Sequence, residues 1–400
     1  MKNFAANLRR ESADWVSRGI VSAEQRERLL DLYPDREEPA SRFLGVLSLV
    51  GGLLVALGVI LVISANWERI GDWVKIAGLL ALLAAAYAGG WALKMRPGAR
   101  HPKTGEALLM VGTILFLAGI ALVSQIFHLN ARPASGLLVW WLGIVLVPLL
   151  TASRGAQLVS LGAFLSWLGM EMGTPGSPLR IVGDREADVA WLTAFAWFGG
   201  LGVALLFLGL ALRRGTFQEF AGMHEKWGLL LLHVSLYLLG FARHITDYRQ
   251  DYLLTVALLP GLLLGALLVG TGFLVGRRNP AEARPLLPWI GLALVPVVAV
   301  LLGIDLGDGQ WAWSVASWIA LFVLDLGLIR VGVDAGREGW VNLAVGFLGL
   351  NIITRYFDLF GTMLDGGLLF LSAGVVILLL GLYLEKKRRR LLASLREEAA

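Results

Sequence analysis

The sequence contains no cysteine and few charged residues for its length. The absence of cysteine excludes disulfide bonds, thiolate metal sites and cysteine nucleophiles. Charged residues make up 16% of the 400 residues and hydrophobic residues 57%, whereas soluble domains average about 25% charged residues. The mean hydropathy of +0.70 is likewise that of a largely apolar chain. The chain is therefore predicted to be a membrane protein rather than a large soluble domain.

Motifs that mark soluble chemistry are also missing. The first forty residues hold no apolar stretch, so we expect no cleaved signal peptide. There is no GxxxxGK[ST] phosphate loop, no GxGxxG after a strand, no HExxH and no GxSxG. The five histidines lack metal-ligand spacing, and the basic residues lie where membrane orientation requires them. We predict no catalytic residues, no metal, no cofactor and no nucleic-acid partner.

Apolar segments follow one another from Phe43 onward. Each has about 15–25 residues, long enough or nearly long enough to cross a bilayer as a helix. The fold class that this pattern predicts is all-α, a polytopic transmembrane helix bundle of about twelve spans. The predicted spans are residues 43–65, 73–93, 104–127, 135–151, 155–170, 188–212, 227–241, 252–276, 285–304, 311–330, 340–356 and 366–384.

Basic residues alternate between the gaps that separate these spans. Of the 35 Lys and Arg residues, 27 lie before the first span, after the last or in every second gap. Because Lys and Arg concentrate on the cytoplasmic side of membrane proteins, both termini are predicted to be cytoplasmic. An even number of spans agrees with this placement.

The segments that leave the first and seventh spans resemble each other. WERIGDW at 67–73 and FARHITDY at 241–248 share an aromatic residue, Arg, Ile, Asp and a second aromatic residue in order. This likeness indicates two parallel six-span halves, as in many transporters, although recurring interface chemistry explains it too. The predicted domains are a soluble hairpin at 1–42, six-span halves at 43–212 and 227–384, a cytoplasmic linker at 213–226 and a basic tail at 385–400.

The soluble segment 1–42 is predicted to be a small helical hairpin. Phe4, Leu8 and Trp15 lie at helical spacing. Ser22 and Gln25 then form a capping-box pattern at the start of a second helix. One interpretation is a cytoplasmic cap on the bundle, and the other is a docking site for a cytoplasmic protein.

The predicted span 252–276 carries two GxxxG pairs. Gly261 with Gly265, and Gly272 with Gly276, place small residues on one helix face. We expect that face to approach a neighbouring helix closely.

Two titratable residues lie inside apolar spans, where they are costly and therefore indicate function. Asp325 has apolar neighbours on both sides and suggests a carboxylate that loads and releases a proton or cation. The alternative is a structural ion pair with Arg330 or with an arginine of another helix. His233, one turn before Tyr237, is either a bundle histidine or a proton relay.

Other polar residues fall at the outer ends of odd-numbered spans. They either line one outward-facing vestibule, whose arginines hold an anionic group, or face water separately at the interface. These candidate pathway residues are Asn66, Glu68, Arg69, Gln125, His128, Arg243, His244, Asn351, Arg355 and Asp358.

Four segments resemble an uncharacterised bacterial family of predicted polytopic membrane proteins, a domain of unknown function. They are residues 13–25 (ADW followed by GIVSAEQ), 119–129 (GIALVSQIFHL), 355–360 (RYFDLF) and 384–388 (LEKKR). The resemblance covers about the first 150 and last 50 residues. It implies a multi-pass protein of the bacterial inner membrane, in contact with membrane lipids, and implies no catalytic residues.

Three functions are consistent with these patterns. A secondary transporter or flippase-like protein for a small or lipid-linked, anionic substrate is favoured by the spans, Asp325 and the outer polar residues. A membrane scaffold or sensor would bind a partner through residues 1–42. A lipid-modifying transferase would need a reactive pair at the outer face, and the short outer loops leave little room for one.

Overall fold

A computed structural model of the protein describes residues 2–31, 65, 67–98, 101–174, 177, 179–180, 187–241, 258–301 and 309–360, with isolated residues between 374 and 386. All regular secondary structure in these ranges is helical, which confirms the predicted all-α class. The chain divides into two compact units, Met1–Lys75 and Ile76–Ala400. The predicted first span, 43–65, and most of the last one lie outside the described residues.

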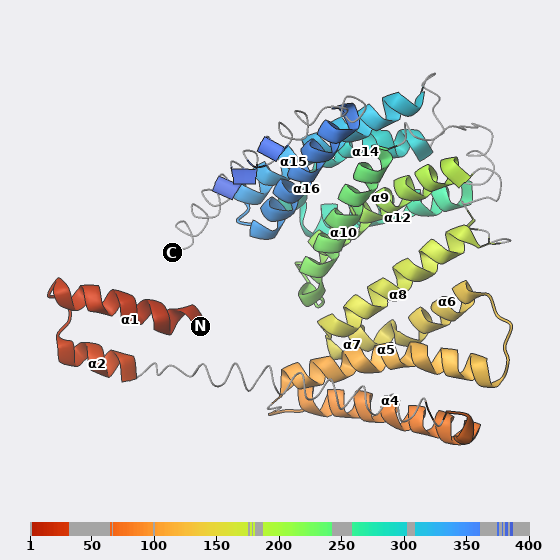
Figure 1. Ribbon diagram of the computed structural model, residues 1–400, viewed down its shortest axis with the longest axis horizontal. Helices are drawn as coiled ribbons and strands as arrows, with labels where there is room; N and C mark the ends of the chain where they lie inside the picture. Colours follow the sequence, from red (N-terminus) through yellow and green to blue (C-terminus); the bar gives the residue numbers. More distant parts are fainter. Residues whose placement is uncertain are drawn as a thin grey trace. The chain divides into compact units, whose positions relative to one another are not determined.

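The first unit contains a helical hairpin. Helices α1 (Lys2–Ser17) and α2 (Ala23–Asp31) pack against each other (Figure 1). The Ser22 hydroxyl accepts from the Gln25 amide at 3.1 Å, and the Ser22 amide donates to Gln25 Oε1 at 2.9 Å. This reciprocal pair is the capping box that the sequence predicts. A short 3-10 helix, η1 (Trp67–Arg69), precedes α4.

Ten of the predicted spans are helical where the structure describes them. The helices are α4 (Asp72–Lys94), α5 (Pro102–Ile126), α6 (Pro133–Ile144), α7 (Leu146–Thr151), α8 (Arg154–Gly173), α9 (Ala187–Leu212), α10 (Gln218–Leu239), α12 (Leu258–Arg278), α13 (Pro280–Ala283), α14 (Leu287–Leu301), α15 (Gly309–Asp334) and α16 (Glu338–Phe360). The predicted span 135–151 is divided into α6 and α7. Pro148 has no N–H to donate to the carbonyl of Ile144, the residue at which α6 ends.

Six stretches of helix are long and apolar enough to cross a membrane. Within the described residues these are Asp72–Lys94, Pro102–Ile126, Pro133–Thr151, Trp191–Leu212, Gly261–Arg278 and Trp311–Asp334. The protein is therefore membrane-embedded. Helix α14 is apolar but has only 15 residues. The count of twelve spans and the cytoplasmic position of both termini stay predictions.

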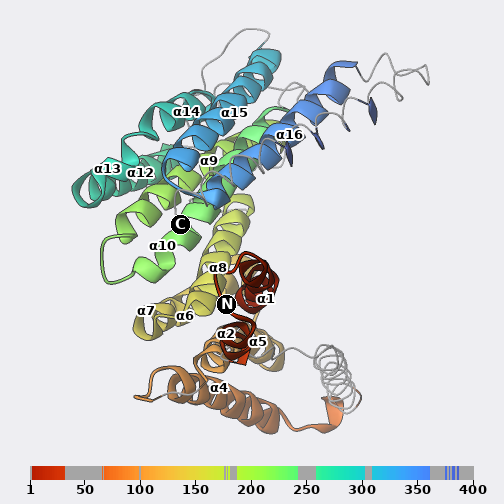
Figure 2. The same ribbon diagram turned by 90° about the vertical axis from the view of Figure 1, so that its left-hand side faces the viewer.

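Helix α9 is the most enclosed of these segments. Of its most apolar stretch, 78% is buried, and it packs against α10, α12 and α14. Helix α15 packs against α10, α14 and α16. Helices α15 and α16 lie side by side in both views (Figure 1 and Figure 2). The main hydrophobic core lies among these helices. Helix α9 thus packs mainly against helices that follow it in the chain.

Glycines set the distance between α9 and α10. A Cβ atom added to Gly228 would lie 2.5 Å from the Leu206 nitrogen and 2.6 Å from the Gly202 oxygen. One added to Gly209 would lie 2.8 Å from the Ala221 oxygen. The two backbones are therefore in direct contact at two levels, an arrangement that small residues permit in membrane helices.

The GxxxG pairs of α12 do not form a close backbone contact with another described helix. Among the described residues, nothing lies within 4 Å of a Cβ atom added to Gly261, Gly265 or Gly276. Gly272 meets only the ring of Phe207, at 4.0 Å. The expectation of a close approach at these glycines is wrong for the described part of the chain, because α12 contacts α9 through other residues, including Leu264.

Replacing Gly228 by alanine is expected to destabilise the α9–α10 pair, because the added methyl group collides with backbone rather than with a flexible side chain. Overpacking of this kind costs about 1–3 kcal/mol. Thermal unfolding of the detergent-solubilised protein measures the effect. Gly270→Ala in α12 is the matched control, since open space surrounds that position. Equal melting temperatures for the two variants would contradict the close contact.

Candidate functional site

His233 of α10 and Asp325 of α15 form a buried pair. The His233 Nε2 atom lies 3.1 Å from Asp325 Oδ1, and neither side chain has any exposed surface. The Phe347 ring of α16 covers the imidazole with a centroid distance of 5.0 Å. Asp325 Oδ2 is buried and has no hydrogen-bond partner within the described residues. Two titratable groups are thus enclosed at the junction of three helices.

The hydrogen bonds of His233 define how many protons the pair holds. Its Nδ1 atom lies 2.6 Å from the Leu229 carbonyl oxygen, which can only accept, so Nδ1 carries hydrogen. The contact between Nε2 and Oδ1 then needs one more proton, on either atom. The pair is neutral overall with that proton on either side. A further proton can be added at Oδ2, which would give the pair a net positive charge.

A second polar group, the Arg355 cluster, lies near one end of the same helices. It consists of Arg355, Asp358, Asn351, Trp318 and the Gly240 carbonyl. Arg355 Nη1 donates to Asp358 Oδ2 at 2.7 Å and to the Gly240 oxygen at 3.1 Å. The Trp318 indole donates to the same oxygen at 2.7 Å, and its ring lies 4.4 Å from the guanidinium carbon. The arginine is 8% exposed, so it is part of the packed interior.

A third group, the Glu225 cluster, lies toward the opposite helix ends. It consists of Glu225 of α10, Arg213, Arg337 and Glu282 of α13. Glu225 is bound by Arg213 at 2.5 and 2.7 Å and by Arg337 at 2.7 Å. Arg337 also pairs with Glu282. Burial lowers the pKa of Arg337, which lies between α15 and α16, and the nearby Glu225 carboxylate opposes that shift. Two arginines and two glutamates balance in charge.

The three groups form polar layers along α10. His233 follows Glu225 by eight positions, and Gly240 follows His233 by seven. At 1.5 Å per residue, the layers are about 12 Å and about 10 Å apart along the helix. Beside the Arg355 cluster, the hydroxyl groups of Tyr237 of α10 and Thr354 of α16 lie 2.9 Å apart. Polar groups therefore recur along α10 where it meets α15 and α16.

Four other predicted pathway residues lie in the described part of the chain. Glu68 and Arg69 lie in the first unit and are exposed, and Gln125 and His128 are exposed at the α5–α6 connection. Predicted residues outside the described part of the chain are Asn66, Arg243 and His244. Of the predicted vestibule, the structure thus brings together Asn351, Arg355 and Asp358. No group of three potential His, Asp or Glu metal ligands occurs in the described ranges.

The Glu225 cluster was not predicted from the sequence. Its basic members lie in gaps between spans, where topology alone explains them, and Glu225 lies just before the predicted span 227–241. One signal was available, because Arg213 and Glu225 flank a short connection and antiparallel helices bring such positions together. Arg337 is 112 positions from Glu225, and no local pattern predicts their contact.

Comparison with known proteins supports a membrane location and indicates no activity. Residues 13–157 match the family DUF2157, described as a predicted membrane protein. This confirms the resemblance that the N-terminal motifs indicate. The match ends within α8, so the His233–Asp325 pair lies outside it. No curated protein and no solved structure matches the chain.

Replacing Glu225 by glutamine is expected to lower stability strongly. The change removes the buried carboxylate that both arginines bind and leaves them only Glu282, and breaking a buried ion pair costs up to about 3–5 kcal/mol. Thermal unfolding of the purified protein reports the loss. Glu219→Gln on the same helix, at a partly exposed position, is the control and should remain close to wild type. A Glu225→Gln protein as stable as the control would show that the cluster contributes little.

Proposed function

We propose that this protein is a secondary transporter of the bacterial inner membrane, coupled to protons through His233 and Asp325. In this proposal both termini are cytoplasmic, and the substrate is small or lipid-linked. The observation that carries the proposal is the enclosed His233–Asp325 pair, with one carboxylate oxygen unpartnered among the described residues. A pair that is neutral with one proton shared between Nε2 and the carboxylate, and cationic after a further proton is added at Oδ2, can carry charge across a barrier.

A contribution to folding stability does not explain why this buried pair is present. Desolvating two ionisable groups offsets most of their attraction, and apolar residues of similar size are often at least as stabilising. Ionisable residues at membrane depth are instead typical of ion and proton pathways. The pair also lies where three helices meet, so a small change in their packing would alter its access to water.

The polar layers support a route to the pair. On one side, Tyr237 follows His233 by one helical turn, and its hydroxyl group contacts Thr354 beside the Arg355 cluster. On the other side, the Glu225 cluster connects α10 to the α15–α16 turn. Because both His233 and Asp325 are fully buried, this conformation is closed at the pair. Alternating access then requires α15 or α16 to move relative to α10. An anionic substrate at Arg355 would have to displace Asp358.

Proton uptake by reconstituted vesicles tests the proposal. The wild-type protein is placed in liposomes that contain a pH-sensitive dye, with the membrane potential clamped, and the external solution is acidified. We expect Asp325→Asn to slow acidification of the lumen by at least about tenfold, because it removes a proton-transfer group. His233→Gln should have a similar effect.

The control is Asp334→Asn, the same substitution at an exposed end of the same helix. It should acidify at the wild-type rate. All variants are compared at equal amounts of monodisperse protein, so that misfolding is distinguished from loss of transfer. Wild-type vesicles no faster than protein-free vesicles, or Asp325→Asn vesicles equal to wild type, would overturn the proposal.

A second candidate function is partner binding through residues 1–42. The observation that favours it is the α1–α2 hairpin, which carries its own capping box and belongs to a compact unit separate from most of the bundle. Ile20, at its turn, is 65% exposed. In this view the hairpin is a scaffold or sensor element. Deleting residues 2–31 distinguishes the two functions, because proton uptake should survive the deletion if transport resides in the bundle.

A further inference from the structure

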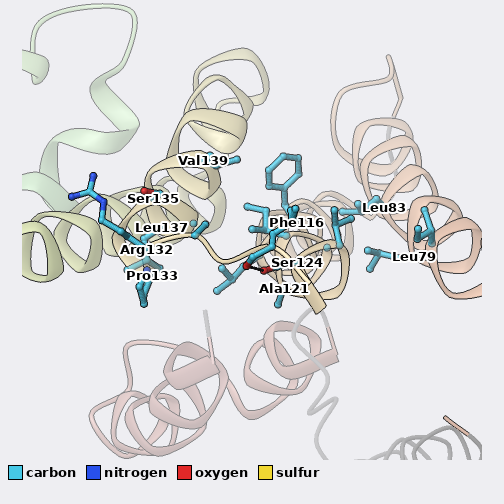
Figure 3. A pocket seen from close by; sticks show the side chains of 18 of the residues that line it. Leu79, Leu83, Phe116, Ala121, Ser124, Arg132, Pro133, Ser135, Leu137 and Val139 are labelled. Atoms are coloured by element: carbon cyan, nitrogen blue, oxygen red, sulfur yellow. Dashed lines mark hydrogen bonds between the residues drawn. The ribbon is translucent and has the colours of Figure 1, made fainter. Parts of the chain in front are cut away.

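An apolar groove runs between α4 and α6 and crosses the surface of α5. Its volume is about 650 Å³, within the range of small-molecule sites, about 300–1,000 Å³. Figure 3 shows Leu79 and Leu83 of α4 on one side, Phe116 in the middle and Val139 of α6 on the other. Helices α4 and α5, and the stretch Pro133–Thr151 that comprises α6 and α7, are each long and apolar enough to cross a membrane. The groove therefore faces an environment of lipid.

The groove occupies only one end of these helices. It extends over eight residues of α4, from Ile76 to Leu83, and over nine residues of α5, from Phe116 to Ser124. These lengths correspond to about 10–12 Å, less than the about 15 Å thickness of one leaflet of the hydrocarbon core. A transmembrane helix would need a groove along the full length of α4 and α5. The dimensions fit an occupant that enters from one leaflet.

The polar groups of the groove are concentrated at one level. Ser124, Arg132 and Ser135 lie at or near the α5–α6 connection, where the helices leave the membrane. Within the described lining, Arg132 is the only charged residue, and its side chain is 50% exposed. Its guanidinium lies 3.6 Å from Glu171 of α8. The deeper lining is apolar, so the site is amphipathic along the membrane normal.

Arg132 also borders a second hollow. This space has a volume of about 560 Å³ and is lined by Arg132 and Pro133 together with α8 residues that include Gly169 and Gly173. A headgroup beside Arg132 therefore has room outside the groove. Arginine binds phosphate through paired hydrogen bonds, and the amino end of α6 adds a favourable field for an anion.

We propose that this groove binds an anionic phospholipid, with one acyl chain between α4 and α6 and the phosphate at Arg132. The proposal does not depend on proton transport by His233 and Asp325. The site lies within residues 76–139, and a bound lipid would cover apolar side chains that the described protein leaves exposed, including Val139 and Leu80.

Photo-crosslinking in nanodiscs tests the site. The full-length protein is reconstituted with phosphatidylglycerol or with phosphatidylcholine, each carrying a diazirine in one acyl chain, and adducts are mapped by mass spectrometry. We expect phosphatidylglycerol adducts on the groove residues of α4, α5 and α6. Ala121→Trp, which fills the groove, should reduce these adducts by about fivefold or more, whereas Ala266→Trp on the exposed face of α12 should not.

The charge on Arg132 is tested separately. Arg132→Gln should lower phosphatidylglycerol capture about fivefold, to the level of phosphatidylcholine, since one arginine near anionic lipid contributes on the order of 1 kcal/mol, equivalent to that factor. Arg154→Gln, an exposed arginine at the start of α8, is the control. The melting temperature of Arg132→Gln is measured as well, because the change also removes the charge beside the buried Glu171 carboxylate.

A third variant identifies the occupant directly. Benzoylphenylalanine placed at Val139 should capture phosphatidylglycerol. Cross-links from this position to residues 43–65, or to a second copy of the chain, would overturn the proposal in favour of a protein occupant. Equal capture of the two lipids, or lipid capture that Ala121→Trp does not reduce, would also overturn it.

Discussion

The backbone contact between α9 and α10 is the constraint on which the second unit depends. Gly202, Gly209 and Gly228 remove the side chains that would otherwise separate the two helices. Once α10 is held against α9, its remaining faces are available to α15 and α16. Glu225 and His233, both on α10, then face partners from later helices. Close packing of two apolar helices thus determines where the ionisable groups meet.

The two polar ends of this helix cluster differ in chemistry. The Glu225 cluster joins four charged side chains from separate segments, and charge balance holds it together. Among the described residues, the Arg355 cluster includes the Arg355–Asp358 ion pair, and the Asn351 side chain, aromatic rings and a backbone carbonyl also contact the arginine. Within the described residues, the contacts of the His233–Asp325 pair between them are the Leu229 carbonyl and the Phe347 ring, with no second ion pair.

Local patterns in the sequence predicted the helices well. Apolar runs placed α4, α5 and α9 within two residues of their observed ends, and the capping box of Ser22 and Gln25 forms as expected. Asp325 and His233 were selected as candidate site residues because of their apolar surroundings, and both are buried in the structure. Their pairing could not be predicted, because 92 residues separate them and helix order does not fix which faces meet. For the same reason, the GxxxG pairs of α12 predicted a close helix contact that the described residues do not show.

The contact between Glu225 and Arg337 has a consequence for synthesis of the chain. Arg213 is translated before Glu225, but Arg337 follows 112 residues later. Until the α15–α16 turn emerges from the ribosome, Glu225 has one of its two arginines, and Glu282 adds a second carboxylate. A chain that stops short of residue 337 therefore supplies two glutamates and one arginine to this cluster. The charges balance only with Arg337, immediately before α16, so α16 is made after the cluster has its full set of partners.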